Sequence, residues 1–276
     1  MHRSVVVMAA WLVPALAAAQ APTEAPVFYA DPATKCQVGT YFPGEHVAVR
    51  WSGPCVGGKA DGAGVAEWQD AGAFASRSEG TFHAGLQEGR GIRVTADGRR
   101  FEAEFRAGRM TGRCVWIKPD SFRIDGQCVD GKLNGRAVAD FSDGDRYEGE
   151  FRDNKMTGHG KFTHHNGAIQ EGEWLDAHLH GRGRAVYKSG ESYEGDYVNG
   201  DYEGTGVYRF ANGDFYEGEF HNGYPDGRGV LHGTTHGLLG AFHHDFVGTW
   251  AQGCFRQGEY TAEIFKSRAD CGFSDD

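Results

Sequence analysis

The histidines are the residues that could most readily do chemistry, and they gather in one part of the chain. Ten of the thirteen histidines lie between His159 and His244, among them the adjacent pair His164 and His165. Histidine is a common zinc ligand, so this density suggests a metal site. None of the ten, however, has a cysteine or carboxylate partner at a recognised ligand spacing, and no HExxH pattern occurs. The sequence therefore predicts no metal site in residues 159–244.

Glycine pairs and cysteines suggest two further kinds of chemistry. Gly-x-Gly recurs, as at Gly158/Gly160 and Gly204/Gly206, but neither the third glycine nor the helix of a dinucleotide-binding loop follows. A Gly-x-Ser-x-Gly elbow is absent and the cysteines are expected in disulfides, so nucleophilic catalysis lacks a nucleophile. We therefore expect no cofactor and no enzymatic activity. A hydrolase acting on an envelope polymer would need paired carboxylates, for which only the irregular stretch 231–245 remains.

The first residues predict a secretory signal peptide over 1–19. A basic start at Arg3 precedes an apolar run from Val5 to Ala18, and small residues up to Ala19 suit cleavage before Gln20. The run is shorter than the ~18 or more apolar residues typical of a membrane-spanning helix. We therefore expect a secreted or periplasmic protein.

Six cysteines would remain after cleavage, and an even number in an oxidising compartment predicts disulfides. The cysteines fall into three pairs of sequence neighbours. These pairs are Cys36–Cys55, Cys114–Cys128 and Cys254–Cys271.

Net charge narrows the class of partner. Removal of Arg3 leaves 28 − 1 = 27 Lys+Arg against 38 Asp+Glu, so the formal charge changes from −10 to −11. Nucleic acid and anionic lipid both require clustered basic residues, and the longest groupings here are Arg99–Arg100 and Arg182/Arg184. We expect no nucleic-acid partner, and the charge disfavours membrane contact.

Glycine is 43 of 276 residues, and its regular spacing indicates a repeat. The phrase aromatic-acid-Gly-acid-aromatic at Tyr147–Phe151 recurs every 23 residues, and the same step backwards finds degenerate copies. Its copies are 51–55, 78–82, 101–105, 124–128, 147–151, 170–174, 193–197 and 216–220, the first preceding the rest with four extra residues.

Turn pairs such as Asp143-Gly144, Asn166-Gly167 and Asn212-Gly213 predict that each repeat is a β-hairpin. A three-residue loop centred on the turn glycine would set aromatic residues opposite one another, glycines opposite rings, and Cys114 opposite Cys128. A two-residue loop would place the rings of the two strands on opposite faces. The expected pairs are Phe141–Tyr147, Tyr187–Tyr193, Phe210–Tyr216, Gly91–Phe105, Gly160–Trp174, Gly183–Tyr197 and Gly206–Phe220.

The phrase and its period resemble the MORN (membrane occupation and recognition nexus) repeat, in a bacterial secreted type. The resemblance covers about residues 51–230, with a further copy at Phe246–Trp250. It implies an all-β fold, an elongated single-layer antiparallel meander of seven or eight hairpins, in proteins that scaffold, bind partners or contact phospholipid. Residues 20–50 and 231–276 would form terminal caps. Departures from the repeat pattern are Ser78, Ala103, Cys128, Ala137 and Gln170.

Strand alternation predicts an aromatic face and an acidic face, and both are candidate binding surfaces. An unlayered sheet would expose rings to a peptide or glycan, although the rings also suit packing over glycines. Two interpretations of the acidic face stand: a solvated surface, or recognition of a basic peptide or divalent ion. The candidate residues are Tyr147, Trp174, Tyr193, Tyr197, Tyr216 and Phe220, with Glu148, Glu171, Glu194 and Glu217.

Together these features predict a non-enzymatic protein-binding or scaffolding module whose partner is a protein or envelope component. The alternative is an envelope-associated protein that binds lipid or glycan. Exposed sheet edges would also allow two copies to pair as a homodimer. The stretch 231–245, where the period lengthens, has no explanation in the repeat.

Overall fold

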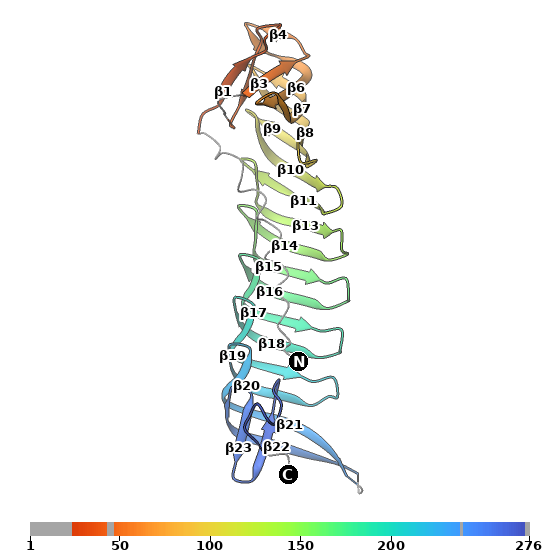
Figure 1. The fold of residues 1–276 in the computed structure, drawn as a ribbon, viewed down its shortest axis with the longest axis vertical. Coiled ribbons are helices and arrows are strands. Elements are labelled where there is room, and N and C mark those ends of the chain that lie inside the picture. Colours follow the sequence, from red (N-terminus) through yellow and green to blue (C-terminus); the bar gives the residue numbers. More distant parts are fainter. Residues whose placement is uncertain (1–23, 43–46, 238–239, 274–276) are drawn as a thin grey trace. The chain divides into compact units, whose positions relative to one another are not determined.

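The computed structural model describes residues 24–42, 47–237 and 240–273, and within these ranges every regular element is a β-strand. The chain divides into two compact units, an N-terminal unit that ends at Lys155 and a C-terminal unit that begins at Met156. Figure 1 shows the described strands of both units, coloured along the sequence. None of the described residues forms a helix that is long and apolar enough to span a membrane. The predicted signal peptide, 1–19, lies outside the described residues.

The N-terminal unit contains a small sheet and an antiparallel meander. The small sheet has the order β1-β2-β5-β4, in which β2 and β5 are parallel. Its strands are β1 (Val27–Ala30), β2 (Gln37–Thr40), β4 (Cys55–Val56) and β5 (Lys59–Ala60). The meander contains β3 (Val47–Trp51), β6 (Gly62–Asp70), β7 (Ala73–His83), β8 (Leu86–Thr95), β9 (Arg100–Arg106), β10 (Arg109–Lys118), β11 (Phe122–Val129), β12 (Lys132–Leu133), β13 (Gly135–Phe141) and β14 (Arg146–Arg152).

The C-terminal unit continues the hairpin pattern, each strand pairing antiparallel with the next. Its strands are β15 (Lys155–Thr163), β16 (Ile169–Leu175), β17 (His178–Val186), β18 (Ser192–Val198), β19 (Asp201–Arg209), β20 (Phe215–His221), β21 (Tyr224–Gly237), β22 (Gly240–Ala251), β23 (Cys254–Gln257) and β24 (Tyr260–Glu263). The all-β antiparallel meander is therefore confirmed.

Two kinds of turn alternate along the meander. Within a repeat, the loop 142–144 is closed by a hydrogen bond from the Phe141 N–H to the Asp145 carbonyl, and Gly144 is its last residue with φ +92°. Between repeats, two-residue turns such as Asn199–Gly200 have positive φ at both positions, the type I′ geometry that suits a twisted hairpin.

The predicted hairpin register was wrong by two residues. Tyr147 pairs with Ala139 and Tyr193 with Ala185, whereas Phe141 and Tyr187 had been expected opposite them. The cause is the position of the turn glycine, which is the last residue of the loop and not its centre. Because the shift is even, each side chain keeps its predicted face. The other corrected pairs are Tyr208–Tyr216, Gly89–Phe105, Gly158–Trp174, Gly181–Tyr197, Gly204–Phe220 and Gly112–Cys128.

Rings still cover glycines, but through diagonal and same-strand contacts. A Cβ added at Gly183 would lie 3.1 Å from the Tyr197 ring, whereas at Gly206 it would meet Tyr193 and not Phe220. Trp174 donates its Nε1–H to the Gly160 carbonyl at 2.9 Å. In the repeat that begins at Ser78, the amide of Gln87 takes the place of a ring and lies over Gly91. The repeat glycines therefore leave room for side chains that cross the bare backbone.

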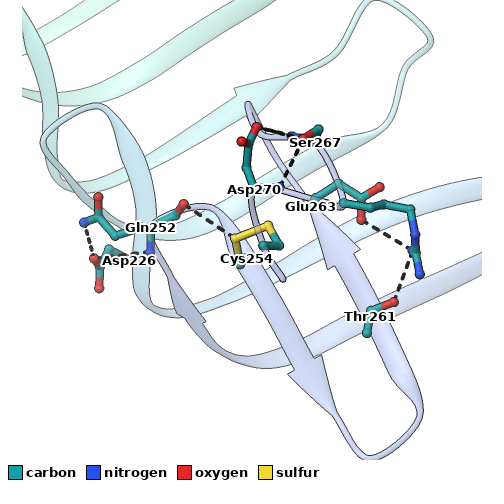
Figure 2. Close-up of a disulfide and its surroundings, with 9 residues drawn as sticks. Asp226, Gln252, Cys254, Thr261, Glu263, Ser267 and Asp270 are labelled. Carbon is teal, nitrogen blue, oxygen red and sulfur yellow. Dashed lines mark hydrogen bonds and ion pairs between the residues drawn. A yellow bond between two sulfur atoms is a disulfide. The ribbon is translucent and has the colours of Figure 1, made fainter. Parts of the chain in front are cut away.

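The structure contains the three disulfides Cys36–Cys55, Cys114–Cys128 and Cys254–Cys271. Cys114 pairs in register with Gly126 and not with Cys128, so the disulfide joins diagonal neighbours whose Cα atoms are 5.8 Å apart. The third disulfide anchors the segment after β24 against β23, where Ser267 also donates to the Asp270 carboxylate (Figure 2).

The stretch 231–245, unexplained by the sequence, belongs to one lengthened hairpin. Strands β21 and β22 pair without interruption from Gly227–Trp250 to Gly237–Gly240. Trp250 lies 5.2 Å from the Tyr216 ring, so Phe246–Trp250 takes the place of a further repeat copy. The longer period therefore reflects a longer hairpin and no new element.

Candidate functional site

The aromatic residues proposed as a binding surface form the core of the array. Tyr147, Tyr193 and Tyr216 are 0% exposed, and Tyr197 is 1% exposed. Trp174 and Phe220 are also buried. Rings from successive strands pack on one another, as Tyr193 stacks on Tyr202 at 3.7 Å and meets Phe220 at 5.0 Å. The expectation of an exposed aromatic face was wrong, because bending of the strands closes the rings against their neighbours.

The bend occurs at the glycine of each aromatic-acid-Gly-acid-aromatic phrase. Register shifts fall between Gly195 and Asp196 in β18 and between Gly218 and Phe220 in β20. The Tyr193 hydroxyl donates to the Asp196 carbonyl at 3.1 Å, and that of Tyr216 donates to the Glu219 carbonyl at 3.2 Å. We call the ring-bearing side of the sheet the inner face.

The opposite side, which we call the outer face, carries the predicted glutamates. Glu148, Glu171, Glu194 and Glu217 are all exposed. They share this face with basic and aliphatic side chains, so the prediction of a purely acidic ladder was incomplete. The two units differ in the side chains that separate the acids.

In the N-terminal unit, acids alternate with aliphatic residues along one row of register partners. Val115 stands between Glu102 and Asp125, and Val138 stands between Asp125 and Glu148. The aliphatic side chains are half-buried, so they separate the carboxylates without making a large apolar patch. The full row is Val65, Glu79, Ile92, Glu102, Val115, Asp125, Val138 and Glu148.

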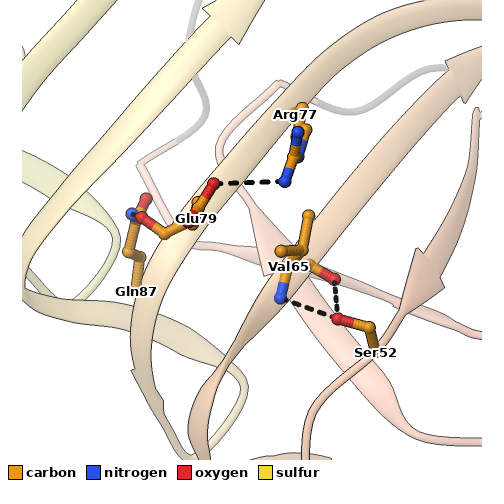
Figure 3. Close-up of polar contacts among 5 residues, drawn as sticks. All are labelled: Ser52, Val65, Arg77, Glu79 and Gln87. Atoms are coloured by element: carbon orange, nitrogen blue, oxygen red, sulfur yellow. Dashed lines mark hydrogen bonds and ion pairs between the residues drawn. The ribbon is translucent and has the colours of Figure 1, made fainter.

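A column of arginines runs beside this acidic row. Arg77, Arg100, Arg123 and Arg146 recur at the 23-residue period, each two residues before an acid of the row. The ion pairs are Arg77–Glu79 at 3.1 Å (Figure 3), Arg100–Glu102 at 2.8 Å, Arg123–Asp125 at 3.9 Å and Arg146–Glu148 at 2.5 Å. Sequence reasoning missed this column, although its spacing was visible once the period was known.

A second arginine column flanks the acids on the other side. Arg90, Arg113 and Arg136 also follow the 23-residue period, and all three are exposed. Arg113 makes two hydrogen bonds to the Asp125 carboxylate, at 3.1 and 2.9 Å. This hydrogen bonding is the largest cause that lowers the pKa of Asp125. The N-terminal outer face is therefore a regular lattice of alternating charges.

The C-terminal unit has a different outer face. Lys161 is opposite Glu171, and Arg184 lies between Glu171 and Glu194, so charges alternate at first. Further along, Val207 and Val230 are the register partners of Glu217. The face therefore becomes acidic and aliphatic towards β22.

Several carboxylates accept hydrogen bonds from backbone N–H groups at the turns between repeats. Glu203 accepts a hydrogen bond from the Asn222 N–H at 3.0 Å, and Glu88 accepts one from the Ala107 N–H at 2.8 Å. These carboxylates satisfy backbone donors at positive-φ turn residues, so they belong to the architecture of the repeat. The first acids of the following repeat phrases lie exposed on the outer face instead: Glu148, Glu171, Glu194 and Glu217.

The histidines are distributed among separate contacts. His221 lies 2.6 Å from Glu203, and His232 lies 2.8 Å from Asp245 while its ring stacks on Phe215 at 4.3 Å. Among the described residues, no group of three or more histidine, cysteine or acidic side chains is arranged to hold a metal ion. The expectation of no metal site therefore stays a prediction for the whole chain.

The repeats match the family model of the MORN repeat. Seven consecutive copies match, over residues 79–99, 101–122, 125–146, 147–169, 171–192, 193–215 and 216–237, which together make up more than half of the chain. No curated protein matches the sequence.

Two solved structures show limited similarity. One is the SAS-4 (dCPAP) TCP domain of Drosophila melanogaster in complex with a proline-rich motif of Ana2 (dSTIL), with 8% identity, a TM-score of 0.33, and coverage of 56% of this chain and 84% of that one. The other is a mutant TCP10 domain of Danio rerio CPAP, with 13% identity, a TM-score of 0.25, and coverage of 73% of this chain and 95% of that one.

Proposed function

Because the chain belongs to the MORN repeat family, we propose that it is a non-enzymatic binding or scaffolding protein that acts outside the cytoplasm. Its contact surface is the outer face of the N-terminal unit. This proposal rests on the charge lattice of that face, in which acids and arginines recur together every 23 residues. The candidate aromatic residues of the repeats are instead buried in the core: Tyr147, Trp174, Tyr193, Tyr197, Tyr216 and Phe220.

The lattice favours a protein partner with a patterned charged surface. Arg77, Arg100, Arg123, Arg146 and Arg113 are each already paired with an acid of the row, so the face has little net attraction for a polyanion. A partner must instead match alternating charges, which gives specificity and a strong dependence on salt. The half-buried aliphatic row between the acids offers the apolar contacts that a stable interface needs.

Export is supported by the three disulfides of the described residues, because stable disulfides are typical of oxidising compartments. The apolar N-terminal sequence supports the same proposal.

Site-specific photo-crosslinking in the native compartment tests the proposed contact surface. A photoreactive residue at Val115, in the aliphatic row, is expected to give one discrete protein adduct that mass spectrometry identifies. The control places the same residue at Ser142, which is exposed in the loop after β13. Equal adducts at the two positions, or none at Val115, would contradict the outer-face contact.

A vesicle flotation assay tests the alternative partner class. We expect the mature protein to stay unbound to vesicles of neutral phosphatidylcholine, with or without anionic phosphatidylglycerol, at low and high salt. Binding that persists at high salt with neutral lipid would instead favour envelope association through lipid.

A further inference from the structure

The inner face of the N-terminal unit contains a basic group where other repeats have a ring. Ser78 occupies the position of the leading aromatic residue, and its register partner in β8 is Arg93. The Arg93 side chain lies on the buried side, with Nε donating to Ser78 Oγ at 3.2 Å and the guanidinium 5.4 Å from the Phe105 ring centre. Ser78 and Phe105 are both 2% exposed, so the arginine enters the ring row.

Arg93 has no negative partner there. No ion pair joins it to any carboxylate in the part of the chain that the structure describes. Removal from water lowers the pKa of the Arg93 guanidinium to about 10, so the group still carries its charge at neutral pH. A half-buried charge without a counter-charge is costly, and an anion would relieve that cost.

An unsatisfied hydrogen-bond donor lies on the same face. Phe101 is the register partner of both Arg93 and Trp116, and the Phe101 and Trp116 rings are 5.4 Å apart. Trp116 is 6% exposed, and its buried Nε1–H has no acceptor. The equivalent atoms of Trp51 and Trp174 each donate to a backbone carbonyl, whereas that of Trp250 is, like that of Trp116, buried without an acceptor.

Lys118 extends this set of donors. It lies two residues after Trp116 on β10 and therefore on the same face, and it is half-buried. It too forms no ion pair among the described residues. Nearby Arg99 differs, because it is neutralised by Asp97 at 2.7 Å.

We propose that Arg93 anchors an anion site on the inner face, on which Trp116 and Lys118 are further donors, and that this site takes a carboxylate from an acidic peptide segment. Guanidinium, ammonium and indole N–H groups donate hydrogen bonds and accept none, so their natural ligand offers only acceptors. A carboxylate matches the planar fork of arginine, and the rings of Phe101 and Phe105 suit the methylene stem of a glutamate. This site is separate from the outer face, and the inference does not rest on the outer-face contact.

The proposal is tested by titrating the mature protein with an acetylated, amidated hexaglutamate peptide. Calorimetry measures the binding, and the indole N–H NMR signal of Trp116 reports on the site. Saturable binding that shifts this signal is expected. Arg93→Met should weaken binding by about tenfold or more, because it removes a charge-assisted pair. Arg90→Met is the matched control: Arg90 is on the same strand, and its substitution removes the same charge from the outer face.

Trp116→Phe keeps one aromatic ring in place and removes the N–H together with the rest of the indole, so it tests the site even if Arg93→Met does not fold. We expect it to weaken binding by roughly threefold. Inorganic phosphate is the second probe. Absence of hexaglutamate binding, equal weakening in Arg90→Met and Arg93→Met, or binding of phosphate alone would overturn the carboxylate site.

Discussion

Tyr193 and Tyr197 are four residues apart on β18, yet their ring centroids are only 5.2 Å apart and their planes meet at 88°. In an extended strand, the Cα atoms of such residues would be about 13 Å apart. The strand bends between them, where its register with β19 shifts after Gly195. The pairs Tyr147–Phe151 and Tyr216–Phe220 repeat this geometry at 5.3 and 5.2 Å, which makes the bend a property of the repeat.

The first prediction concerns the glycine at this bend. A Cβ at Gly195 would lie 2.5 Å from the Tyr193 hydroxyl and 2.6 Å from the Cα of Gly206. Gly195→Ala should lower the free energy of unfolding by about 3 kcal/mol, because a backbone atom cannot move aside as a side chain can. Urea denaturation measures this loss. Gly233→Ala is the control, because its nearest neighbour would be 3.8 Å away; an equal loss there would refute the explanation.

The second prediction compares two buried tyrosine hydroxyls. Tyr216 donates to the Glu219 carbonyl, so Tyr216→Phe should cost about 1 kcal/mol of stability. The hydroxyl of Tyr197 is buried without a partner, so Tyr197→Phe should be neutral or stabilising. Thermal denaturation of the two variants distinguishes them. A larger loss of stability in Tyr197→Phe than in Tyr216→Phe would contradict these hydrogen-bond assignments.

Hairpins, faces and disulfide pairs could be predicted from the sequence because the 23-residue period and the turn pairs are local signals. The register could not, since it depends on where Gly144 lies within its loop. Burial of Tyr193 could not be predicted either, because alternation gives the face of a side chain but not the bend that closes rings together. Arg93 on the inner face was equally hidden, because a charged residue there breaks the alternation rule.

The third prediction concerns export and the disulfides. Mass spectrometry of the mature protein, digested without reduction, should find Gln20 at the N-terminus and a peptide in which Cys114 is joined to Cys128. A retained Met1 together with free thiols would argue for a reducing compartment and against export.

The fourth prediction is a pH dependence from Glu203 and His221. The Asn222 N–H, and then His221, lower the pKa of Glu203 below its ordinary 4.5, while the hydrogen bond to Glu203 raises the pKa of His221 above 6.5. The stability that Glu203 contributes is fully present above pH 4.5 and is lost as the pH falls through the pKa of Glu203 in the folded protein. Stability from His221 is present below 6.5 and is lost as pH rises through its folded pKa. The joint contribution of Glu203 and His221 to the free energy of unfolding is therefore greatest between pH 4.5 and pH 6.5.

NMR titration of the His221 ring checks this coupling. In Glu203→Gln the pKa of His221 should fall towards its ordinary value, since the charged acceptor is gone. An unchanged titration curve would show that the pair does not form in solution.

The proposed partner contact of the outer charge lattice is tested most directly by an exchange of two charges. The variant Arg100→Glu with Glu102→Arg keeps the net charge and the ion pair but reverses the local pattern. Calorimetry against the partner identified by crosslinking should show affinity reduced about tenfold or more, because like charges would then face each other. The melting temperature should stay unchanged. An unaltered affinity in the folded variant would contradict the claim that this face binds the partner.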